Sequence, residues 1–173
     1  MSTRLTEAQM RALADELLDA YNRHDVDALL PHYTDDVVWT EPTLPAPARG
    51  RREVAAALKD TFTAFPDLHV GTEDFALYPD VEGQSGVVTW SLTGTMTGAM
   101  SNGVPATGRS VAMSGANVAR FRDGLICEYT FHYDSLAMMQ QLGMLPKSTG
   151  IGFKAIVMAD VAAARARKVL QRH

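Results

Sequence analysis

The sequence predicts an α+β fold, in which N-terminal helices cover a cone-shaped, curved and mostly antiparallel sheet and an extra helix follows at the C-terminus. Three observations predict it. Apolar residues recur at helical spacing through the first third of the 173-residue chain, strand-like runs separated by turn-forming residues follow, and a helical pattern returns at the end. Helices grouped on one face of an antiparallel sheet are typical of this class. Because a curved sheet under helices encloses space, we also expect a hydrophobic cavity.

Two helices are expected at the start of the chain. Thr6 can cap the first through its hydroxyl group, with Gln9 three residues on, and apolar residues keep helical spacing as far as Asn22. Asp25 can cap a second, short helix, which Pro31 bends or shortens because proline lacks a backbone N–H group. The first part of the chain is therefore expected to form the helical layer.

One strand and one helix are expected next. Asp35 and Asp36 predict a turn into the strand Val37–Glu41, after which Pro42 begins an extended and irregular segment. The segment Glu53–Ala64 carries apolar side chains at helical spacing, so it predicts the third helix.

The remaining chain predicts four longer strands and two helices. The strands form an expected antiparallel meander with turn residues between them: Leu68–Tyr78, Gly86–Gly98, Arg109–Phe121 and Leu125–Tyr133. Asp134 can cap a helix over Ser135–Leu142, and the alanine-rich segment Phe153–Arg172 predicts a closing helix. We expect two parts, a cone-shaped domain over residues 1–146 and a C-terminal helical extension over residues 147–173.

Composition and charge argue against several classes of protein. The net charge of −4 gives no reason to expect a nucleic-acid partner, since proteins that bind nucleic acid are usually strongly basic. Cys127 is the only cysteine, so no internal disulfide can form, and a lone cysteine fits a reducing compartment. The N-terminus lacks the apolar segment of a signal peptide, and no run of about 20 apolar residues could span a bilayer. We therefore expect a cytoplasmic protein with no membrane partner.

Glu41 is the leading candidate for a catalytic residue. Strand alternation places Val37, Trp39 and Glu41 on one face, so a carboxylate follows two apolar side chains directly before Pro42. A buried carboxylate costs free energy unless it is paired or used in function. The alternative is an ion pair with an arginine of the following segment: Arg49, Arg51 or Arg52.

Asn117 is the second polar candidate on an apolar face. The same alternation places it beside Met113 and Phe121 on the inward side of its strand. A base and a hydrogen-bond donor in one dry cavity would suit proton transfer beside a carbonyl group. The alternative for Asn117 is a core amide satisfied by backbone groups. The histidines stand singly without converging ligands, so neither a metal nor a cofactor is expected.

Large apolar side chains on the predicted inner faces are candidates for contact with a small hydrophobic ligand. They would shape the site and raise the pKa of Glu41 by removing water from it. The alternative is that they serve only as core or cavity wall. The candidates are Trp39, Phe62, Trp90, Met113, Tyr129 and Phe131.

Several short stretches resemble the SnoaL-like polyketide cyclases and ester cyclases of the nuclear transport factor two superfamily. The likeness covers roughly residues 6 to 146 and implies the cone-shaped fold and a homodimer that forms through the outer face of the sheet. The stretches that carry it are Tyr21–Asp25, Asp36–Pro42, Ala64–Leu68, Ala106–Arg109, Arg120–Gly124, Asp134–Leu136 and Gln141–Gly143.

The resemblance also implies which catalytic positions are kept. The cyclases place a catalytic aspartate where this chain has Phe131, and a histidine where it has Asn117, so their usual acid/base is absent. The ketosteroid isomerases, which are more distant relatives, hold a proton-abstracting aspartate before a proline, and Glu41 occupies that place. Their oxyanion-donating aspartate corresponds to Asn117. Their helix-borne tyrosine corresponds to Leu17, one helical turn from Tyr21.

These observations favour an enzyme that transfers a proton on a hydrophobic carbonyl compound without a cofactor, as a polyketide-type cyclase or isomerase does. Glu41 would remove the proton, and Asn117 and Tyr21 would stabilise the enolate oxygen. The alternative is a protein of the same fold that binds a small ligand or a subunit without chemistry, which Phe131 favours. Epoxide hydrolysis ranks third, because the last predicted strand lacks the aspartate that the related hydrolases use.

Overall fold

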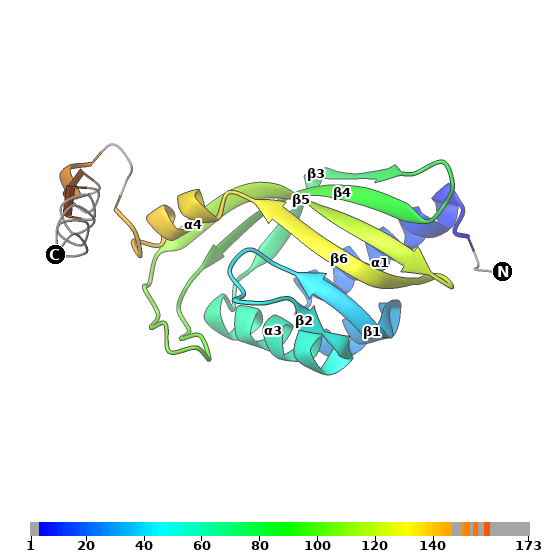
Figure 1. Ribbon diagram of the computed structural model, residues 1–173, viewed down its shortest axis with the longest axis horizontal. Helices are drawn as coiled ribbons and strands as arrows, with labels where there is room; N and C mark the ends of the chain where they lie inside the picture. The colour runs from blue at the N-terminus through cyan, green and yellow to red at the C-terminus, as the bar shows by residue number, and fades with distance from the viewer. Residues whose placement is uncertain (1–3, 147–149, 153, 156–157, 160–173) are drawn as a thin grey trace, which may run out of the picture.

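The computed structural model describes residues 4–146, 150–152, 154–155 and 158–159. The helices of the N-terminal part lie along one side of a curved sheet, and a further helix follows the last strand (Figure 1). The elements, in chain order, are α1 (Glu7–Asn22), α2 (Val26–Leu29), the 3₁₀ helix η1 (Leu30–His32), β1 (Tyr33–Thr40), β2 (Ala48–Arg49), α3 (Gly50–Ala64), β3 (His69–Pro79), β4 (Ser85–Thr95), β5 (Ser110–Arg122), β6 (Leu125–Tyr133) and α4 (Ser135–Gln141).

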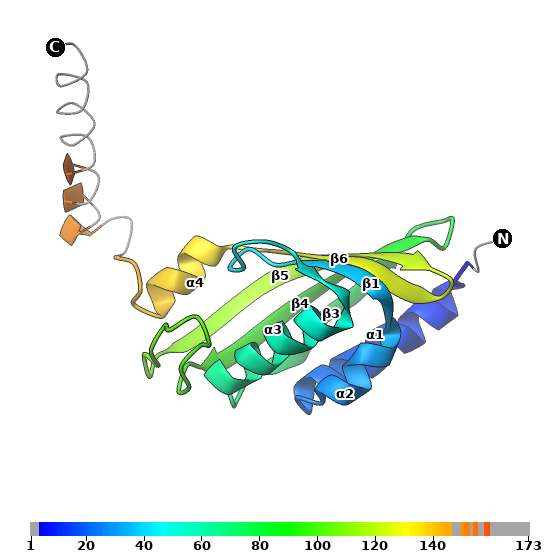
Figure 2. The ribbon, with the colours of Figure 1, turned by 60° about the horizontal axis from the view of Figure 1, so that its bottom comes forward.

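The sheet has six strands in the order β2-β1-β6-β5-β4-β3. Neighbouring strands pair antiparallel except β1 and β6, which run parallel. Figure 2 shows α1, α2 and α3 beneath the concave side of this sheet. The α+β class and the curved, mostly antiparallel sheet under N-terminal helices are therefore as predicted.

Helices α1, α2 and α4 begin where the sequence predicts, whereas α3 begins at Gly50 and not at the predicted Glu53. Thr6 and Gln9 form a complete capping box at the start of α1, because the Thr6 hydroxyl accepts from the Gln9 N–H and the Gln9 side chain accepts from the Thr6 N–H. The Asp25 carboxylate caps α2 by accepting from the Ala28 N–H at 3.0 Å. Asp134 caps α4 in the same way. The expected helix Phe153–Arg172 falls mostly on residues outside the described ones.

The start of the sheet differs from the prediction. Asp35 and Asp36 lie inside β1 rather than in a turn, because the strand already begins at Tyr33. The segment expected to be irregular up to Gly50 contains the short strand β2, which pairs Arg49 with Val38. The strand is only two residues long, because the preceding prolines lack the N–H groups that sheet pairing needs.

A local irregularity in β6 changes which side chains face inward. Strict alternation predicts Cys127 on the inner face with Tyr129, but the pairing with β5 shifts between Arg120 and Phe121. Phe121 pairs with Ile126, so Ile126 points inward and Cys127 does not. The prediction for Cys127 was wrong because a bulge cannot be seen in the pattern of apolar residues.

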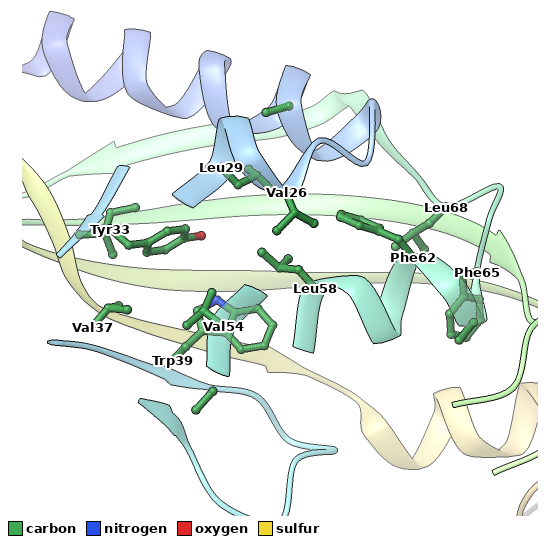
Figure 3. Packing of buried hydrophobic residues seen from close by; sticks show 14 of the residues in the cluster. Val26, Leu29, Tyr33, Val37, Trp39, Val54, Leu58, Phe62, Phe65 and Leu68 are labelled. Atoms are coloured by element: carbon green, nitrogen blue, oxygen red, sulfur yellow. The ribbon is translucent and has the colours of Figure 1, made fainter. Parts of the chain in front are cut away.

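The buried core joins the helices to the inner face of the sheet. Val54 and Leu58 of α3 are 0% and 2% exposed, and they lie against Trp39 of β1 and Leu29 of α2 (Figure 3). This packing holds the helical layer against β1. It thereby positions the residue that directly follows β1, which is Glu41.

Candidate functional site

A pocket of about 270 Å³ lies between the helices and the inner face of the sheet. Its wall is mainly apolar, and its polar groups are few. Besides Glu41 and Asn117, these include the side chains of Tyr21, Tyr33, Thr43 and Tyr129. A mostly apolar pocket with a few convergent polar groups is the usual form of a small-molecule site.

Glu41 reaches this pocket from the end of β1. Its Oε2 atom accepts a hydrogen bond from the Thr43 N–H at 3.1 Å and another from the Thr43 hydroxyl. The Leu44 N–H donates to the Glu41 carbonyl oxygen at 3.1 Å, which completes a tight turn around Pro42. The carboxylate is therefore held by its own loop.

No arginine neutralises Glu41 in the described part of the chain. Arg51, an expected alternative partner, instead bonds to Asp35 at 3.1 Å and to the Tyr33 carbonyl oxygen. The Arg49 side chain and Arg52 form no ion pair with Glu41 either, among the residues that the structure describes. The alternative of an ion-paired Glu41 is therefore wrong for the described chain.

Burial raises the pKa of Glu41 above the ordinary glutamate value. The hydrogen bonds from Thr43 and from the Leu44 N–H favour the charged form and offset part of that effect. A carboxylate with a raised pKa is a stronger base than an exposed one. This suits a group that must take up a proton during a reaction.

Asn117 is 7% exposed and is satisfied by side chains, not by backbone groups. Its Oδ1 atom accepts from the Trp90 indole N–H at 2.9 Å, and its Nδ2 atom donates to the Tyr129 hydroxyl at 3.0 Å. Gly115 makes room for the indole, since a Cβ atom there would lie 2.5 Å from a Trp90 ring carbon. The alternative of a backbone-satisfied amide was therefore wrong.

Three tyrosines bring buried hydroxyl groups to the pocket. Tyr21 comes from α1, Tyr33 from β1 and Tyr129 from β6. Burial raises the pKa of all three, and electrostatic interaction with Tyr129 raises those of Tyr21 and Tyr33 further. These phenols therefore stay protonated and can donate hydrogen bonds.

The aromatic wall is only partly as predicted. Trp39 and Phe131 meet edge-to-face with ring centroids 4.7 Å apart, and Phe131 contacts Tyr129 in the same way at 5.0 Å. These three residues line the pocket, as do Trp90 and Met113. Contact of the five with a ligand stays a prediction.

Phe62 is the exception among the predicted ligand contacts. It does not line this pocket, because its ring packs on Tyr21 at 5.0 Å and stacks on His24 at 4.3 Å. Figure 3 shows it pointing from α3 into the buried core beside Val26. The helical spacing predicted that Phe62 is buried, but spacing could not distinguish core from pocket wall.

The sequence prediction missed Tyr33 and Thr43. Tyr33 lay outside the predicted strand, whose start was set too late at Val37. Strict alternation does not hold at the start of β1, because Asp35 is exposed and the pairing with β6 shifts between Tyr33 and Val38, so the pattern could not place Tyr33. The signal for Thr43 was a hydroxyl residue two positions after a carboxylate, at a proline turn.

The described residues contain no group of three histidine, cysteine, aspartate or glutamate side chains arranged to hold a metal ion. Within the same part of the chain, no helix has the length and apolar character needed to cross a membrane.

The chain belongs to the SnoaL-like polyketide cyclase family, whose sequence model matches residues 11–142. The match includes β1 to β6, and it supports a cyclase-type function. Comparison with curated protein sequences gives no significant match.

Solved structures agree with this assignment. TsrD from Streptomyces laurentii is 26% identical with a TM-score of 0.67, and the match covers 82% of this chain and 99% of TsrD. A protein from Jannaschia sp. CCS1, provisionally described as a SnoaL-like polyketide cyclase, is 25% identical with a TM-score of 0.69, over 84% of this chain and 99% of that one. AclR from Streptomyces galilaeus is 23% identical with a TM-score of 0.67, over 97% of this chain and 99% of AclR, and shows the shared fold alone.

Proposed function

We propose that this protein transfers a proton on a hydrophobic carbonyl compound without a cofactor, as a cyclase or isomerase of polyketide-type substrates. Glu41 is the base. It takes a proton from the carbon next to the carbonyl group, and the electron pair of that C–H bond moves toward the carbonyl oxygen to form an enolate. The enolate carbon then attacks a second carbonyl carbon of the same molecule, whose C=O π electrons move to its oxygen, and that oxygen takes the proton back from Glu41. In an isomerisation, Glu41 instead returns the proton to another carbon of a conjugated enolate.

The observation that carries this proposal is the setting of Glu41. A carboxylate in a mainly apolar pocket, without an ion pair among the described residues, has a raised pKa and keeps hydrogen bonds that orient it. A carboxylate that served only the fold would be expected to pair with one of the arginines nearby. The apolar aromatic wall supports a flat, hydrophobic substrate that the pocket folds for an intramolecular reaction.

The experiment measures the exchange of hydrogen for deuterium next to a carbonyl group. The probe is 2-tetralone, a two-ring ketone, in deuterated buffer, with incorporation followed by nuclear magnetic resonance. We expect the protein to accelerate exchange, and Glu41→Gln to reduce the accelerated rate by roughly 100-fold or more, since general bases contribute on the order of 100- to 10,000-fold.

Glu73→Gln is the matched control, because Glu73 is an exposed glutamate on β3. Its exchange rate should equal that of the wild type. Equal rates in the wild type and Glu41→Gln would contradict the assignment of Glu41, and a 2-tetralone that binds without any accelerated exchange would contradict the reaction.

A second candidate is ligand binding without chemistry, favoured by one observation. Phe131 stands where the cyclases of this family carry a catalytic aspartate, and its ring packs between Trp39 and Tyr129 instead. Binding of 2-tetralone without exchange would select this candidate. In either case we propose a homodimer formed through the outer sheet face, where Glu128 and His132 are exposed, and analytical ultracentrifugation tests it.

A further inference from the structure

Asn117 has less freedom to act on a ligand than a lone amide would have. An indole N–H can only donate, so the group facing Trp90 must be the amide oxygen of Asn117. The amide nitrogen is thereby turned toward Tyr129 and donates to its hydroxyl oxygen at 3.0 Å. The orientation of the amide follows from chemistry and needs no choice between two similar atoms.

The two hydrogen bonds, from Trp90 to Asn117 and from Asn117 to Tyr129, determine where the hydrogen of the Tyr129 hydroxyl can point. The Tyr129 oxygen already accepts from Asn117, so its own hydrogen must point elsewhere. Among the described residues, no acceptor receives that hydrogen, and the side chain lines the pocket. A hydroxyl group in a pocket wall that donates to no protein group is available to donate to a ligand oxygen.

Tyr33 brings a second phenol to the pocket from the neighbouring strand β1. Its ring centroid lies 6.1 Å from that of Tyr129, and it is 4% exposed. The Trp39 indole N–H lies close enough to the Tyr33 oxygen to influence its ionisation, but it completes no well-aligned hydrogen bond in the described chain. No acceptor among the described residues receives the phenol hydrogen of Tyr33, and its side chain lines the pocket.

We propose that Tyr129, Tyr33 and Tyr21 form a three-phenol site that donates hydrogen bonds to one oxygen atom of the ligand, with Asn117 and Trp90 as positioning residues. The ligand class is a flat, apolar ring compound that carries a ketone or enolate oxygen. This inference rests on the proposed function, because the oxygen to be held is the one that becomes negative when Glu41 removes a proton. The phenols keep their protons throughout, so the proton lost from the substrate carbon resides on Glu41 alone.

The role differs from the one predicted for Asn117. The amide was expected to hold the enolate oxygen directly, together with Tyr21. In the structure its oxygen is taken by Trp90 and one amide hydrogen by Tyr129, so its main effect on a ligand passes through the Tyr129 hydroxyl.

The test is the infrared carbonyl stretching band of bound 2-tetralone. Hydrogen bonding to a ketone oxygen lowers this frequency, and the measurement needs no turnover. We expect the band in the wild-type complex to lie below its position in hexane, and Tyr129→Phe to abolish most of that shift. We also expect Tyr129→Phe to weaken 2-tetralone binding by roughly 10-fold, while binding of tetralin, the hydrocarbon without the oxygen, stays unchanged.

Two further variants separate positioning from packing. Asn117→Leu should keep tetralin binding but give a smaller and broader carbonyl shift, because the phenol is present but no longer oriented. Tyr78→Phe is the matched control, since Tyr78 is 59% exposed on β3, and it should leave the band where the wild type has it.

Each outcome decides the proposal. A carbonyl band at the same frequency in the wild type and Tyr129→Phe would overturn it, as would a 2-tetralone that binds the wild type no more tightly than tetralin does. If Tyr129→Phe fails to fold, Tyr33→Phe and Tyr21→Phe carry the same expectation of a smaller shift, and an unchanged band in both would overturn the site. Glu41→Gln should keep the shift and lose exchange, so failure of the base and failure of the phenol site give different results.

Discussion

The inner and outer faces of strands β4, β5 and β6 carry different chemistry, although the same backbone supplies both. The inner face holds large side chains that line the pocket, among them Trp90, Asn117 and Tyr129. The outer face holds more polar side chains, among them Thr89, Ser114, Glu128 and His132. Polar atoms on the inner face bond to one another, whereas those on the outer face have water available.

The difference between the two faces indicates where this fold tolerates amino-acid substitutions. On the inner face a new atom meets packed neighbours, and a lost donor leaves a buried acceptor without a partner. On the outer face of the single chain, solvent can replace a lost hydrogen bond and leaves room for a new atom. Adjacent residues of one strand should therefore differ strongly in their sensitivity to substitution.

The largest expected effect is at Gly115, compared with its neighbour Ser114. A Cβ atom at Gly115 would lie 2.5 Å from a Trp90 ring carbon and 2.6 Å from the His132 carbonyl oxygen, which is backbone and cannot turn away. We expect Gly115→Ala to lower the free energy of unfolding by about 2–3 kcal/mol, as overpacking does, and Ser114→Ala to change it by less than about 0.5 kcal/mol. Urea unfolding of both variants measures this, and similar losses would show that the faces do not differ.

A smaller effect is expected from removing one hydrogen bond on each face. Trp90→Phe leaves the buried Oδ1 atom of Asn117 without its donor and should cost about 2 kcal/mol. Thr89→Val removes an exposed hydrogen bond to the Asp74 carbonyl oxygen and should cost less than about 0.5 kcal/mol.

A double-mutant cycle with Asn117→Leu then isolates the buried pair. Because each single variant leaves the other residue without its hydrogen-bond partner, we expect a coupling energy of roughly 1 kcal/mol or more between Trp90 and Asn117. A coupling energy near zero would mean that the indole and the amide contribute independently, and the comparison of the two faces would lose its basis in hydrogen bonding.

The fold could be predicted from the sequence because its signals are local and periodic. The Thr6–Gln9 capping box and the alternation around Asn117 each depend on residues close in the chain, and both predicted the observed element. The start of β1 and the bulge at Cys127 could not be predicted, because they depend on pairing with a distant strand. Periodicity carries no information on such pairing.

The candidate site shows the same difference between features that depend on nearby residues and features that depend on distant ones. Alternation predicted that Glu41 and Asn117 face inward, and both line the pocket. It could not show that Asn117 bonds to Trp90 and Tyr129, because that contact joins three strands. The pairing of Phe62 with Tyr21 and His24 likewise depends on how α3 meets α1, which no local pattern contains.

The smallest expected effect compares two carboxylates associated with β1, one inside and one outside. Asp36 is exposed, and the Thr34 hydroxyl and the Arg122 guanidinium lower its pKa, whereas burial raises the pKa of Glu41. A lowered pKa stabilises the folded state above the ordinary aspartate pKa, and this stabilisation is lost as the pH falls through the lowered value. A raised pKa acts in the opposite direction, because stability is lost as the pH rises from the ordinary glutamate pKa through the raised one.

Glu41→Gln should therefore raise the melting temperature at neutral pH, and Asp36→Asn should lower it slightly. Both differences from the wild type should shrink as the pH falls, because protonation then makes the wild-type side chains neutral like their replacements. Melting curves by circular dichroism from about pH 2 to about pH 8 measure both trends, and the difference for Asp36→Asn should shrink only below the ordinary aspartate pKa, because the pKa of Asp36 is lowered. A Glu41→Gln variant that melts below the wild type at neutral pH would show that the charged carboxylate stabilises the fold, and the strain expected of a buried base would be absent.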